Sequence, residues 1–484
     1  GVAGVDARAF NALADKGISV KLVSQASSER SLGMVVSEAD ASLAQAALEQ
    51  AFGEEEATVG VKRGLTIMNI IGRHNYALER AIYELRRNNI WLHLIANSVE
   101  GHQISLVLDG GNELKALQLV HSQLVGSVKR LHVFCFGKGL VGGTFIRQVL
   151  ESRDHVLEKR RLDVRIVGVA NSQRAYFAFD GLPDDWEAQL LASPEGNEPE
   201  HIIDRLEQSG LSNIVVVDNT ADHGLTEAYP KFVAAGFDLV ASNKKGNARE
   251  QSFYNELRAL LRRKGKRFRY ETNVGAGLPL IDTLIQLHHS HDKITRIKGV
   301  FSGSMSYLFN TYSQRAQSFA TVLQQAQALG YTEPDPREDL NGMDVARKLL
   351  ILARTVDVSA ELTDVDIENL IPEPLRGLET FDEFLSQASV ANDYYQKRLD
   401  GLDADSVLRY VGDLRMDADG RARLKVALME VPKQSPLGSI QGSDSLFEIY
   451  TEGYGDHPMV IQGAGAGAVV TARGVYSDVL RLGE

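Results

Sequence analysis

The 484-residue sequence is poor in cysteine, in long apolar runs and in positive charge. Its one cysteine, Cys135, cannot form an internal disulfide bond, which excludes a disulfide-stabilised secreted scaffold and favours a reducing compartment such as the cytoplasm. No run approaches the ~18 consecutive apolar residues of a membrane-spanning helix. Lysine and arginine number 52 against 64 aspartate and glutamate, a formal net charge of −12, which disfavours nonspecific nucleic-acid binding.

What is present is ordinary globular composition, with 44% apolar and 24% charged residues, and a length that predicts about three domains. The first part of the chain contains a repeat of about 60 residues in the order strand, helix, strand, strand, helix. The second copy has all five elements, whereas the first lacks its opening strand, so we expect the sequence to be a fragment of a longer polypeptide. The elements expected in the second copy are Leu65–Ile71, Tyr76–Arg87, Ile90–Ile95, Ile104–Leu108 and Asn112–Leu124.

A different pattern begins near Val128, where continuous apolar strands alternate with helices. Such strands are typical of a parallel sheet that is covered by helices on both faces. From about Gly275 to Tyr450 the alternation gives way to a mixed pattern of helices and strands, and Val469–Leu480 is predicted to be a closing helix. The parallel strands are expected at Leu131–Phe136, Val164–Ala170, Ile214–Asp218, Asp238–Ala241 and Arg267–Glu271.

A glycine-rich loop follows the first of these strands. Gly137, Gly139 and Gly142 form a G-x-G-x-x-G pattern, and a helix is predicted directly after it. Glycines at this spacing allow a tight turn and close approach of a pyrophosphate to the helix N-terminus, so we predict dinucleotide binding over a plain glycine-rich turn. The second strand ends without a carboxylate for the ribose, and Arg174 could meet a 2′-phosphate or remain a solvated loop residue. NADP is therefore allowed.

The densest polar segment is Gly330–Lys348, which contains a helix whose Asp344 and Lys348 are one turn apart. An exposed ion pair at this spacing contributes only a few tenths of a kcal/mol. If the helix instead lines a cleft, Lys348 becomes a proton donor and carboxylates such as Glu333 and Asp339 become ligands for a substrate ammonium. Spacing alone leaves both interpretations open.

Two further groups lie where the parallel strands are predicted to end. Ligands of open parallel sheets bind at the carboxyl ends of the strands, which places Lys244 and Thr220 at the rim, although a solvated loop lysine is the alternative. The loop Glu271–Pro279 could turn carbonyl oxygens around a monovalent cation, but its glycines favour an interdomain hinge on sequence grounds.

Other reactive residue types carry less weight. Cys135 lies in the middle of an apolar strand, where a thiol is usually an inert core group, and this counts against aldehyde oxidation through a thioester. His288, His289 and His291 fall at a predicted helix end among solvent-facing residues, so metal binding is the less favoured interpretation.

Residues 128–484 resemble homoserine dehydrogenases, and the repeat before them resembles tandem ACT domains. The motifs that carry the first resemblance are F-G-K-G-L-V-G-G, S-N-K-K, E-T-N-V-G-A-G-L-P, F-S-G-S-M-S-Y, G-Y-T-E-P-D-P-R-E-D-L-N-G-M-D-V-A-R-K and Q-G-A-G-A-G. Together the parts are similar to the C-terminal portion of bifunctional aspartokinase–homoserine dehydrogenases, without the kinase. The resemblance implies an α/β and α+β architecture: ferredoxin-like ACT units at 1–60 and 61–126, a Rossmann domain at 127–274 and 451–484, and a mixed-sheet catalytic and dimerisation domain at 275–450.

The resemblance also implies an activity, the reversible NAD(P)H-dependent reduction of L-aspartate 4-semialdehyde to L-homoserine in threonine and methionine biosynthesis. It implies Lys348 as the proton donor to the carbonyl oxygen, Lys244 as a second active-site lysine, and a homodimer or larger homo-oligomer. Implied substrate ligands are Glu333, Asp339 and Asp344; implied cofactor contacts are Gly137, Gly139, Leu140, Val141, Gly142, Arg174, Thr220, Lys244 and Gly467; and an implied sodium or potassium site comprises Glu271 with the carbonyls of Val274, Ala276 and Leu278.

Some positions depart from the family pattern. His291 stands where a glycine is expected before an aspartate. The first ACT unit keeps a stretch that begins at Gln25 and is associated with effector binding, whereas Asn97–Glu100 in the second unit differs. Threonine feedback is therefore a hypothesis that depends mainly on Gln25. Two rivals remain, an amino-acid sensor with an inert dehydrogenase half and an acylating semialdehyde dehydrogenase, and the latter would need an exposed cysteine.

Overall fold

The computed structural model describes residues 4–25, 31–72, 75–98, 102–124, 128–417 and 419–484. The chain divides into two compact units. The first comprises Gly1–Lys129 and Arg205–Asn213, and the second comprises Arg130–Asp204 and Ile214–Glu484. Among the described residues, no helix is both long enough and apolar enough to cross a lipid bilayer.

The first unit contains the predicted repeat. Its second copy forms a three-stranded antiparallel sheet in the order β3-β5-β4, and the helices α3 and α4 bury one face of it around Ile70, Leu106 and Leu119. The first copy forms the antiparallel pair β1-β2. The elements are α1 (Val5–Ala14), β1 (Leu22–Gln25), β2 (Leu32–Val35), α2 (Ala41–Glu56), β3 (Leu65–Ile71), α3 (Asn75–Arg87), β4 (Leu92–Asn97), β5 (Gln103–Asp109) and α4 (Glu113–Leu124).

The second unit opens with a six-stranded sheet in the order β11-β10-β9-β6-β7-β8. The pairs β6-β9, β9-β10 and β10-β11 are parallel, as the apolar strands predicted, and only the short β8 runs antiparallel to its neighbour β7. Its strands are β6 (Lys129–Phe136), β7 (Leu162–Ala170), β8 (Ala175–Phe177), β9 (Ile214–Asp218), β10 (Asp238–Ala241) and β11 (Phe268–Arg269). The helices are α5 (Leu140–Arg160), α6 (Trp186–Ala192), α7 (Pro199–Gln208), α8 (Tyr229–Ala234) and α9 (Gln251–Lys264).

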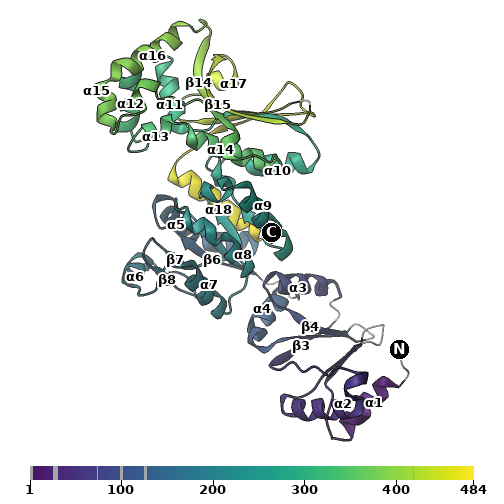
Figure 1. Cartoon of the computed structure of the whole chain (residues 1–484). Helices are drawn as coiled ribbons and strands as arrows, with labels where there is room; N and C mark the ends of the chain where they lie inside the picture. Colours follow the sequence, from purple (N-terminus) through teal and green to yellow (C-terminus); the bar gives the residue numbers. More distant parts are fainter. Residues whose placement is uncertain (1–3, 26–30, 73–74, 99–101, 125–127, 418) are drawn as a thin grey trace. The chain divides into compact units, whose positions relative to one another are not determined.

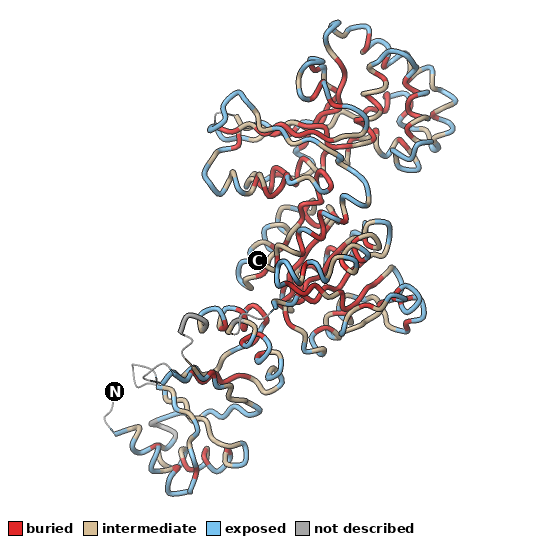
Figure 2. The backbone as a smooth tube through the Cα atoms, turned by 180° about the vertical axis from the view of Figure 1, so that it is seen from behind, coloured by how far each residue is buried: buried red, intermediate tan, exposed pale blue. Residues whose placement is uncertain are grey.

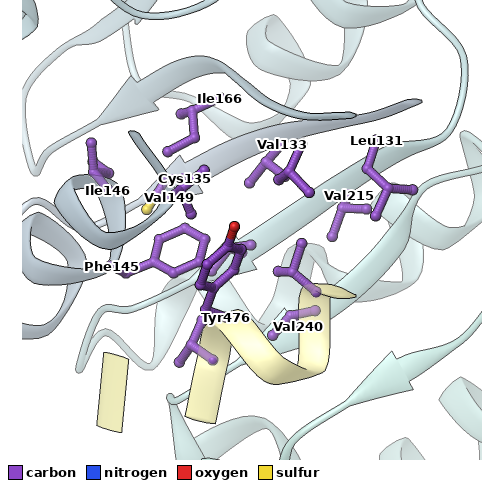
Figure 3. Close-up of a cluster of buried hydrophobic side chains, with 14 of the residues drawn as sticks. Leu131, Val133, Cys135, Phe145, Ile146, Val149, Ile166, Val215, Val240 and Tyr476 are labelled. Carbon is purple, nitrogen blue, oxygen red and sulfur yellow. The ribbon is translucent and has the colours of Figure 1, made fainter. Parts of the chain in front are cut away.

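The core of this sheet is completed by a helix from the far end of the sequence. Helix α18 (Ala468–Leu482) packs beside α5 and places Val475 and Tyr476 against Phe145 (Figures 1 and 3). Ser152 and Tyr476, which are 324 residues apart in the sequence, share a 3.0 Å hydrogen bond. Cys135 lies inside this cluster and is fully buried (Figure 3).

One predicted strand is shorter than expected. The sequence predicted a strand over Arg267–Glu271, but β11 ends at Arg269 and Glu271–Asn273 forms a 3₁₀ turn, η5. The backbone N–H of Glu271 donates to Asp478 Oδ2 of α18 at 2.9 Å instead of continuing a strand ladder. A side chain from a distant helix therefore ends the strand.

The second sheet is mixed, as predicted, in the order β13-β15-β14-β12-β16-β17, with β13-β15 as its parallel pair. Its central strands appear as a buried band in Figure 2. Because β17 pairs with β16, the chain returns to the first sheet after Gly463, not at 451 as expected. The strands are β12 (Ile294–Val300), β13 (Val365–Ile367), β14 (Ser406–Met416), β15 (Ala422–Pro432), β16 (Ser445–Thr451) and β17 (Met459–Gly463). The helices are α10 (Ile281–His289), α11 (Gly303–Tyr312), α12 (Phe319–Ala328), α13 (Arg337–Leu340), α14 (Met343–Thr355), α15 (Phe381–Ser386), α16 (Ala388–Asp400) and α17 (Pro436–Ser439).

Candidate active site

Two lysines meet on one carboxylate in the second unit. Lys244 opens the 3₁₀ turn η4 (Lys244–Ala248), directly beyond β10, while Asp344 and Lys348 occupy the first two turns of α14. Lys244 Nζ lies 2.5 Å from Asp344 Oδ1, and Lys348 Nζ lies 2.8 Å from Asp344 Oδ2. Lys348 Nζ also donates to the carbonyl of Phe301 at 2.9 Å. The structure thus brings Lys244 to two residues of a helix that lies about 100 residues later in the sequence.

The charges of this cluster shift one another's protonation. Burial alone would raise the pKa of Asp344, but the ammonium groups of Lys348 and Lys244 outweigh burial and hold that pKa well below its usual value. Burial and the charge of Lys348 lower the pKa of Lys244, although Asp344 opposes them. Lys244 therefore releases a proton more readily than an ordinary lysine does.

Asp339 and Glu333 lie in the segment that precedes α14. Asp339 Oδ1 accepts from Ser304 Oγ at 2.7 Å, and Asp339 Oδ2 accepts from the backbone N–H of Glu333 at 2.9 Å. Burial raises the pKa of Asp339, while those two hydrogen bonds oppose the rise. The side chain of Glu333 is exposed. Both Asp339 oxygens thus have protein partners that fix the loop presenting the Glu333 carboxylate.

The glycine-rich loop has the geometry of a phosphate-binding turn. Gly137 has φ +89°, and a Cβ on Gly142 would lie 1.8 Å from the Gly137 carbonyl oxygen, so both positions require glycine. Gly139 caps α5, and a Cβ there would meet nothing within 4 Å, which shows an open face at the helix N-terminus. Leu140, the first residue of the helix, is 79% exposed, and Val141 packs partly against the core. These residues fit a pyrophosphate group.

Two other predicted cofactor residues, Arg174 and Thr220, follow strands of the same sheet and have protein partners of their own. Arg174 follows β7 and donates through Nη1 to the carbonyls of Leu191 at 2.7 Å and Ser193 at 3.3 Å. Thr220 Oγ1 donates to Asp218 Oδ1 at 2.7 Å. Gly467 has φ +120° and caps α18.

Sequence reasoning missed Asp218, which organises this edge. The carboxylate lies at the end of β9, is buried, and accepts from Tyr229 Oη at 2.7 Å and Asn243 Nδ2 at 2.9 Å in addition to Thr220. Asn243 directly precedes Lys244, so Asp218 ties the start of η4 to the sheet. An acidic residue closing an otherwise apolar strand is the signal that could have found it.

The proposed cation loop follows η5. Glu271 is buried, and its carboxylate accepts from the backbone N–H of Ile281 at 2.6 Å and of Asp282 at 3.0 Å. Burial and the neighbouring Asp478 raise the pKa of Glu271 to about 7. Gly275 and Ala276 are both in the left-handed region, at φ +79° and +54°.

Two such residues in succession redirect the carbonyls of the loop that runs through Val274, Ala276 and Leu278. A buried carboxylate and backbone carbonyl oxygens are the donor types that suit a sodium or potassium ion, although the Leu278 carbonyl already accepts from the Leu280 N–H at 2.8 Å.

Cys135 and the histidines at 288–291 lie apart from the lysine pair in the sequence. Burial raises the pKa of Cys135 to about 12, as expected of an inert core thiol. His288 Nε2 lies 2.9 Å from Asp357 Oδ2, and within the described ranges no three His, Cys, Asp or Glu side chains gather to hold a metal ion. His291 has φ +61°, which explains why the turn favours glycine at that position.

The predicted effector stretch is described only at its first residue. Gln25 is exposed at the end of β1 and pairs with Leu32 of β2. Residues 26–29 of that stretch, and residues 99–100 at the comparable place in the second repeat, lie outside the described residues.

Comparison with known proteins identifies all three parts of the chain. Residues 279–480 match the family model "Homoserine dehydrogenase", residues 137–271 match "Homoserine dehydrogenase, NAD binding domain", and residues 1–52 match "ACT domain". A homoserine dehydrogenase of Paracoccidioides brasiliensis is 36% identical over 376 residues, which cover 74% of this chain and 99% of that protein. A solved protein of unknown function from Candida auris is 35% identical with a TM-score of 0.67, covering 73% of this chain and 98% of that one.

A longer relative covers the repeat as well. The bifunctional aspartokinase/homoserine dehydrogenase 1 of Zea mays, a chloroplastic protein, is 35% identical over 497 residues, which cover 100% of this chain and 54% of the relative. The chain therefore spans about half the length of such bifunctional relatives.

Proposed function

Because the chain belongs to the homoserine dehydrogenase family, we propose that it catalyses the reversible NAD(P)H-dependent reduction of L-aspartate 4-semialdehyde to L-homoserine. The observation that carries the proposal is the Asp344 carboxylate with one lysine ammonium on each of its oxygens. Reduction of an aldehyde builds negative charge on its oxygen, and a preorganised ammonium stabilises and then protonates that oxygen. When bound, the nicotinamide supplies the hydride in this direction and accepts it in the reverse one.

Lys348 is oriented to be the proton donor. An ammonium has three N–H donors, and among the described residues Asp344 and the Phe301 carbonyl take two of them. The third is left for the substrate oxygen. Lys244 places a second positive charge on the same carboxylate, and its lowered pKa suits a group that must give up a proton more readily than an ordinary lysine. In the oxidative direction the substrate hydroxyl gives up its proton, and a deprotonated lysine accepts it.

The remaining groups orient the substrate and the cofactor. The exposed carboxylate of Glu333 binds the substrate ammonium with Asp344, and Asp339 contributes by fixing the Glu333 loop. The N-terminus of α5, from Gly137 to Gly142, holds the pyrophosphate, with Thr220, Lys244 and Gly467 at the rim. Arg174 turns the preference toward NADP because it can meet a 2′-phosphate.

A sodium or potassium ion completes the second unit in this proposal. Glu271 and the carbonyls of Val274, Ala276 and Leu278 would hold it beside the start of α10. A cation there compensates the buried negative charge of Glu271 and Asp478 and keeps the loop rigid.

The first unit regulates the dehydrogenase in this proposal, with threonine bound at Gln25 as the effector. The whole protein also carries aspartate kinase activity, as the bifunctional relatives are named to do, and assembles as a homodimer or homotetramer in the cytoplasm. Support for regulation comes from the ACT match over residues 1–52. Threonine that leaves both the rate and the melting temperature of the full-length enzyme unchanged would overturn it.

The activity is tested by homoserine-dependent reduction of NADP. The Lys348→Ala variant is expected to lose turnover by ~10² or more while it still binds NADP, because the aldehyde oxygen loses its proton donor. Lys245→Ala is the matched control: Lys245 follows Lys244 in η4 and donates to the Ala221 carbonyl at 2.6 Å, outside the lysine pair. Equal turnover of Lys348→Ala and Lys245→Ala would contradict the proposed role.

A further inference from the structure

The two lysines of the candidate site belong to different segments, so something must hold those segments in register. Lys244 lies in η4 beyond the first sheet, whereas Asp344, 100 residues later, lies on α14. The Lys244–Asp344 ion pair is more than one third exposed, with 36% and 37% of the side chains accessible. Exposed ion pairs contribute little to stability, so this contact cannot by itself fix the two segments.

A buried arginine on α14 bridges to the end of η4. Arg354, in the last turn of α14, is 2% exposed. Its Nη1 donates to the carbonyls of Asn247 at 3.0 Å and Arg249 at 2.5 Å. Its Nε and Nη2 both donate to the carbonyl of Ala360, at 3.1 and 2.8 Å, and Nη2 also reaches Glu361 Oε2 at 3.1 Å. All five N–H donors of the guanidinium are thus used, one of them on η4 and one on Arg249, the residue that follows η4.

The far end of η4 is tied on its other side as well. Asn247 Oδ1 accepts from Arg258 Nη2 at 2.8 Å, and Asn247 Nδ2 donates to Asn273 Oδ1 at 2.9 Å. Asn273 Nδ2 in turn donates to the carbonyl of Ala241, the last residue of β10, at 2.8 Å. Arg354 therefore donates to a turn that is itself hydrogen-bonded to the first sheet through Asn247 and Asn273. These bonds set the position of α14 relative to η4.

We infer that Arg354 is a positioning residue for the proposed reaction: it fixes η4 against α14 so that Lys244 and Lys348 share the carboxylate of Asp344. Arg354 and Lys348 lie on the same helix six residues apart, about 9 Å along its axis, which a continuous helix holds constant. Lys244 and Asn247 are likewise separated by a single 3₁₀ turn. Helix α14 thus carries Lys348 and Arg354, and η4 carries Lys244 and the Asn247 carbonyl that accepts from Arg354.

Packing alone does not account for this arrangement. An apolar side chain of similar volume often stabilises a core as well as a buried charged group does. A guanidinium whose five N–H donors all bind oxygens instead fixes the relative position of the segments that carry those oxygens. Such positioning matters because displacement of a reacting group by about 1 Å can cost ~10²-fold in rate.

The test compares Arg354→Lys with Arg409→Lys. Lysine keeps the charge but offers three donors from one nitrogen, so it cannot hold η4 and Ala360 together. Arg409 is the matched control: it is 4% exposed and its guanidinium donates to the carbonyls of Leu408, Leu437 and Gly438, in the second sheet and away from both lysines. Both variants are expected to lower the melting temperature.

For enzyme that remains folded, Arg354→Lys is expected to lose kcat by about 10- to 100-fold with a less than twofold change in the KM for NADP, and Arg409→Lys is expected to keep its kcat. If both variants keep kcat, or both lose it equally, the inference is overturned.

A second readout does not depend on turnover. Acetylation by an N-hydroxysuccinimide ester, followed by peptide mapping, gives the pH at which Lys244 reacts half-maximally. That pH is expected to rise in Arg354→Lys, because Lys244 leaves the neighbourhood of Lys348, and to stay unchanged in Arg409→Lys. An unchanged labelling profile in Arg354→Lys overturns the inference.

Only the kcat measurement of this inference rests on the proposed function; the labelling measurement does not. Failure of the parent protein to oxidise homoserine would overturn the proposed function, while the labelling arm would still decide the role of Arg354. If Arg354→Lys does not fold, Asn247→Ala tests whether the position of η4 sets the two lysines. This variant loses the side-chain hydrogen bonds to Arg258 and Asn273 and keeps the backbone carbonyl that accepts from Arg354, and roughly tenfold loss of kcat and the same labelling shift are expected.

Discussion

Two carboxylate clusters in the second unit have pKa values that are shifted in opposite directions. At the candidate active site, two ammonium groups hold the pKa of Asp344 well below its usual value although burial opposes them. Near η5, burial and the neighbouring Asp478 raise the pKa of Glu271 to about 7, and burial raises the pKa of Asp478 to about 7. The nearest arginine, Arg481, lies 4.0 Å from Glu271 Oε2 and also pairs with Asp282.

The difference shows that the direction of a pKa shift depends on how many cations face each carboxylate. Asp344 has two ammonium groups in direct contact. Glu271 has Arg481 at 4.0 Å, Asp478 has the charge of Arg269 nearby, and both arginines also pair with Asp282. We therefore interpret Asp344 as a carboxylate whose charge is balanced by the two lysines. Glu271 and Asp478 have less positive charge nearby, and a bound cation would balance them.

The largest expected effect comes from removing the shared carboxylate. Asp344→Asn leaves Lys244 and Lys348 side by side without a counter-charge, so we expect kcat/KM for homoserine to fall by about 10²-fold. Homoserine oxidation needs a deprotonated lysine to accept the hydroxyl proton, and Asp344 raises the pKa of Lys244, so the loss of Asp344 should move the acidic limb of the pH–rate profile to lower pH. Steady-state kinetics from pH 6 to pH 10 measure both changes.

Asp413→Asn provides the control for that variant. Asp413 forms a similarly close pair with Arg296, at 2.7 and 2.5 Å, but in the second sheet. Its replacement is expected to leave the pH–rate profile in place. Equal kinetic losses in the two variants would mean that Asp344 has no special role.

A smaller, pH-dependent effect is expected at the second cluster. In the folded protein Asp478 keeps a proton up to about pH 7, whereas in the unfolded chain its pKa is about 4. Between these values the folded state binds more protons, so the free energy of unfolding falls as the pH rises. Asp478→Asn, which keeps an acceptor for the Glu271 N–H, should raise the melting temperature by about 2–4 °C at pH 8 and leave it nearly unchanged at pH 4.

For Asp344 the free energy of unfolding is expected to depend on pH in the opposite direction. Its depressed pKa contributes stability above the unfolded value of about 4, and that stability is lost only as the pH falls below it. Asp344→Asn should therefore destabilise the protein at pH 8, where Asp478→Asn stabilises it. Thermal melts of both variants across this pH range would contradict the comparison if the two curves moved in the same direction.

The smallest expected effect is that of the cation itself. Exchanging sodium or potassium for tetramethylammonium at constant ionic strength should lower the melting temperature by about 1–3 °C at pH 8, where Glu271 is ionised, and by less at pH 5. Asp478→Asn should reduce this dependence, because it removes one of the two charges that a cation offsets. A melting temperature that is indifferent to the cation at pH 8 would remove support for the site.

Much of this organisation was predictable from the sequence because it follows from local pattern. The strand over Leu65–Ile71 has the bounds that were expected, and the parallel strands follow the apolar runs. The meeting of Lys244 with Lys348 was predicted from the rule that ligands bind at the carboxyl ends of parallel strands, together with the family resemblance.

What the sequence did not predict depends on contacts between distant segments. Arg354 appears in the sequence as one more charged residue near a helix end, and nothing local shows that its guanidinium is buried. Asp478 ends the strand before Glu271 from a helix more than 200 residues away. Asp339 was expected to bind substrate, and the structure shows why it also shapes the loop, since Ser304 lies on another helix.

The position of α18 has a consequence for how the chain acquires its structure. Tyr476 can pack against α5 only after the whole second sheet has been synthesised, because these helices are hundreds of residues apart in the sequence. Contacts of such long range close slowly, and until then Phe145 and Val149 face water. A nascent chain emerging from the ribosome would thus carry an unfinished nucleotide-binding core, a natural target for chaperones, and truncation before Ala468 would be expected to cause aggregation.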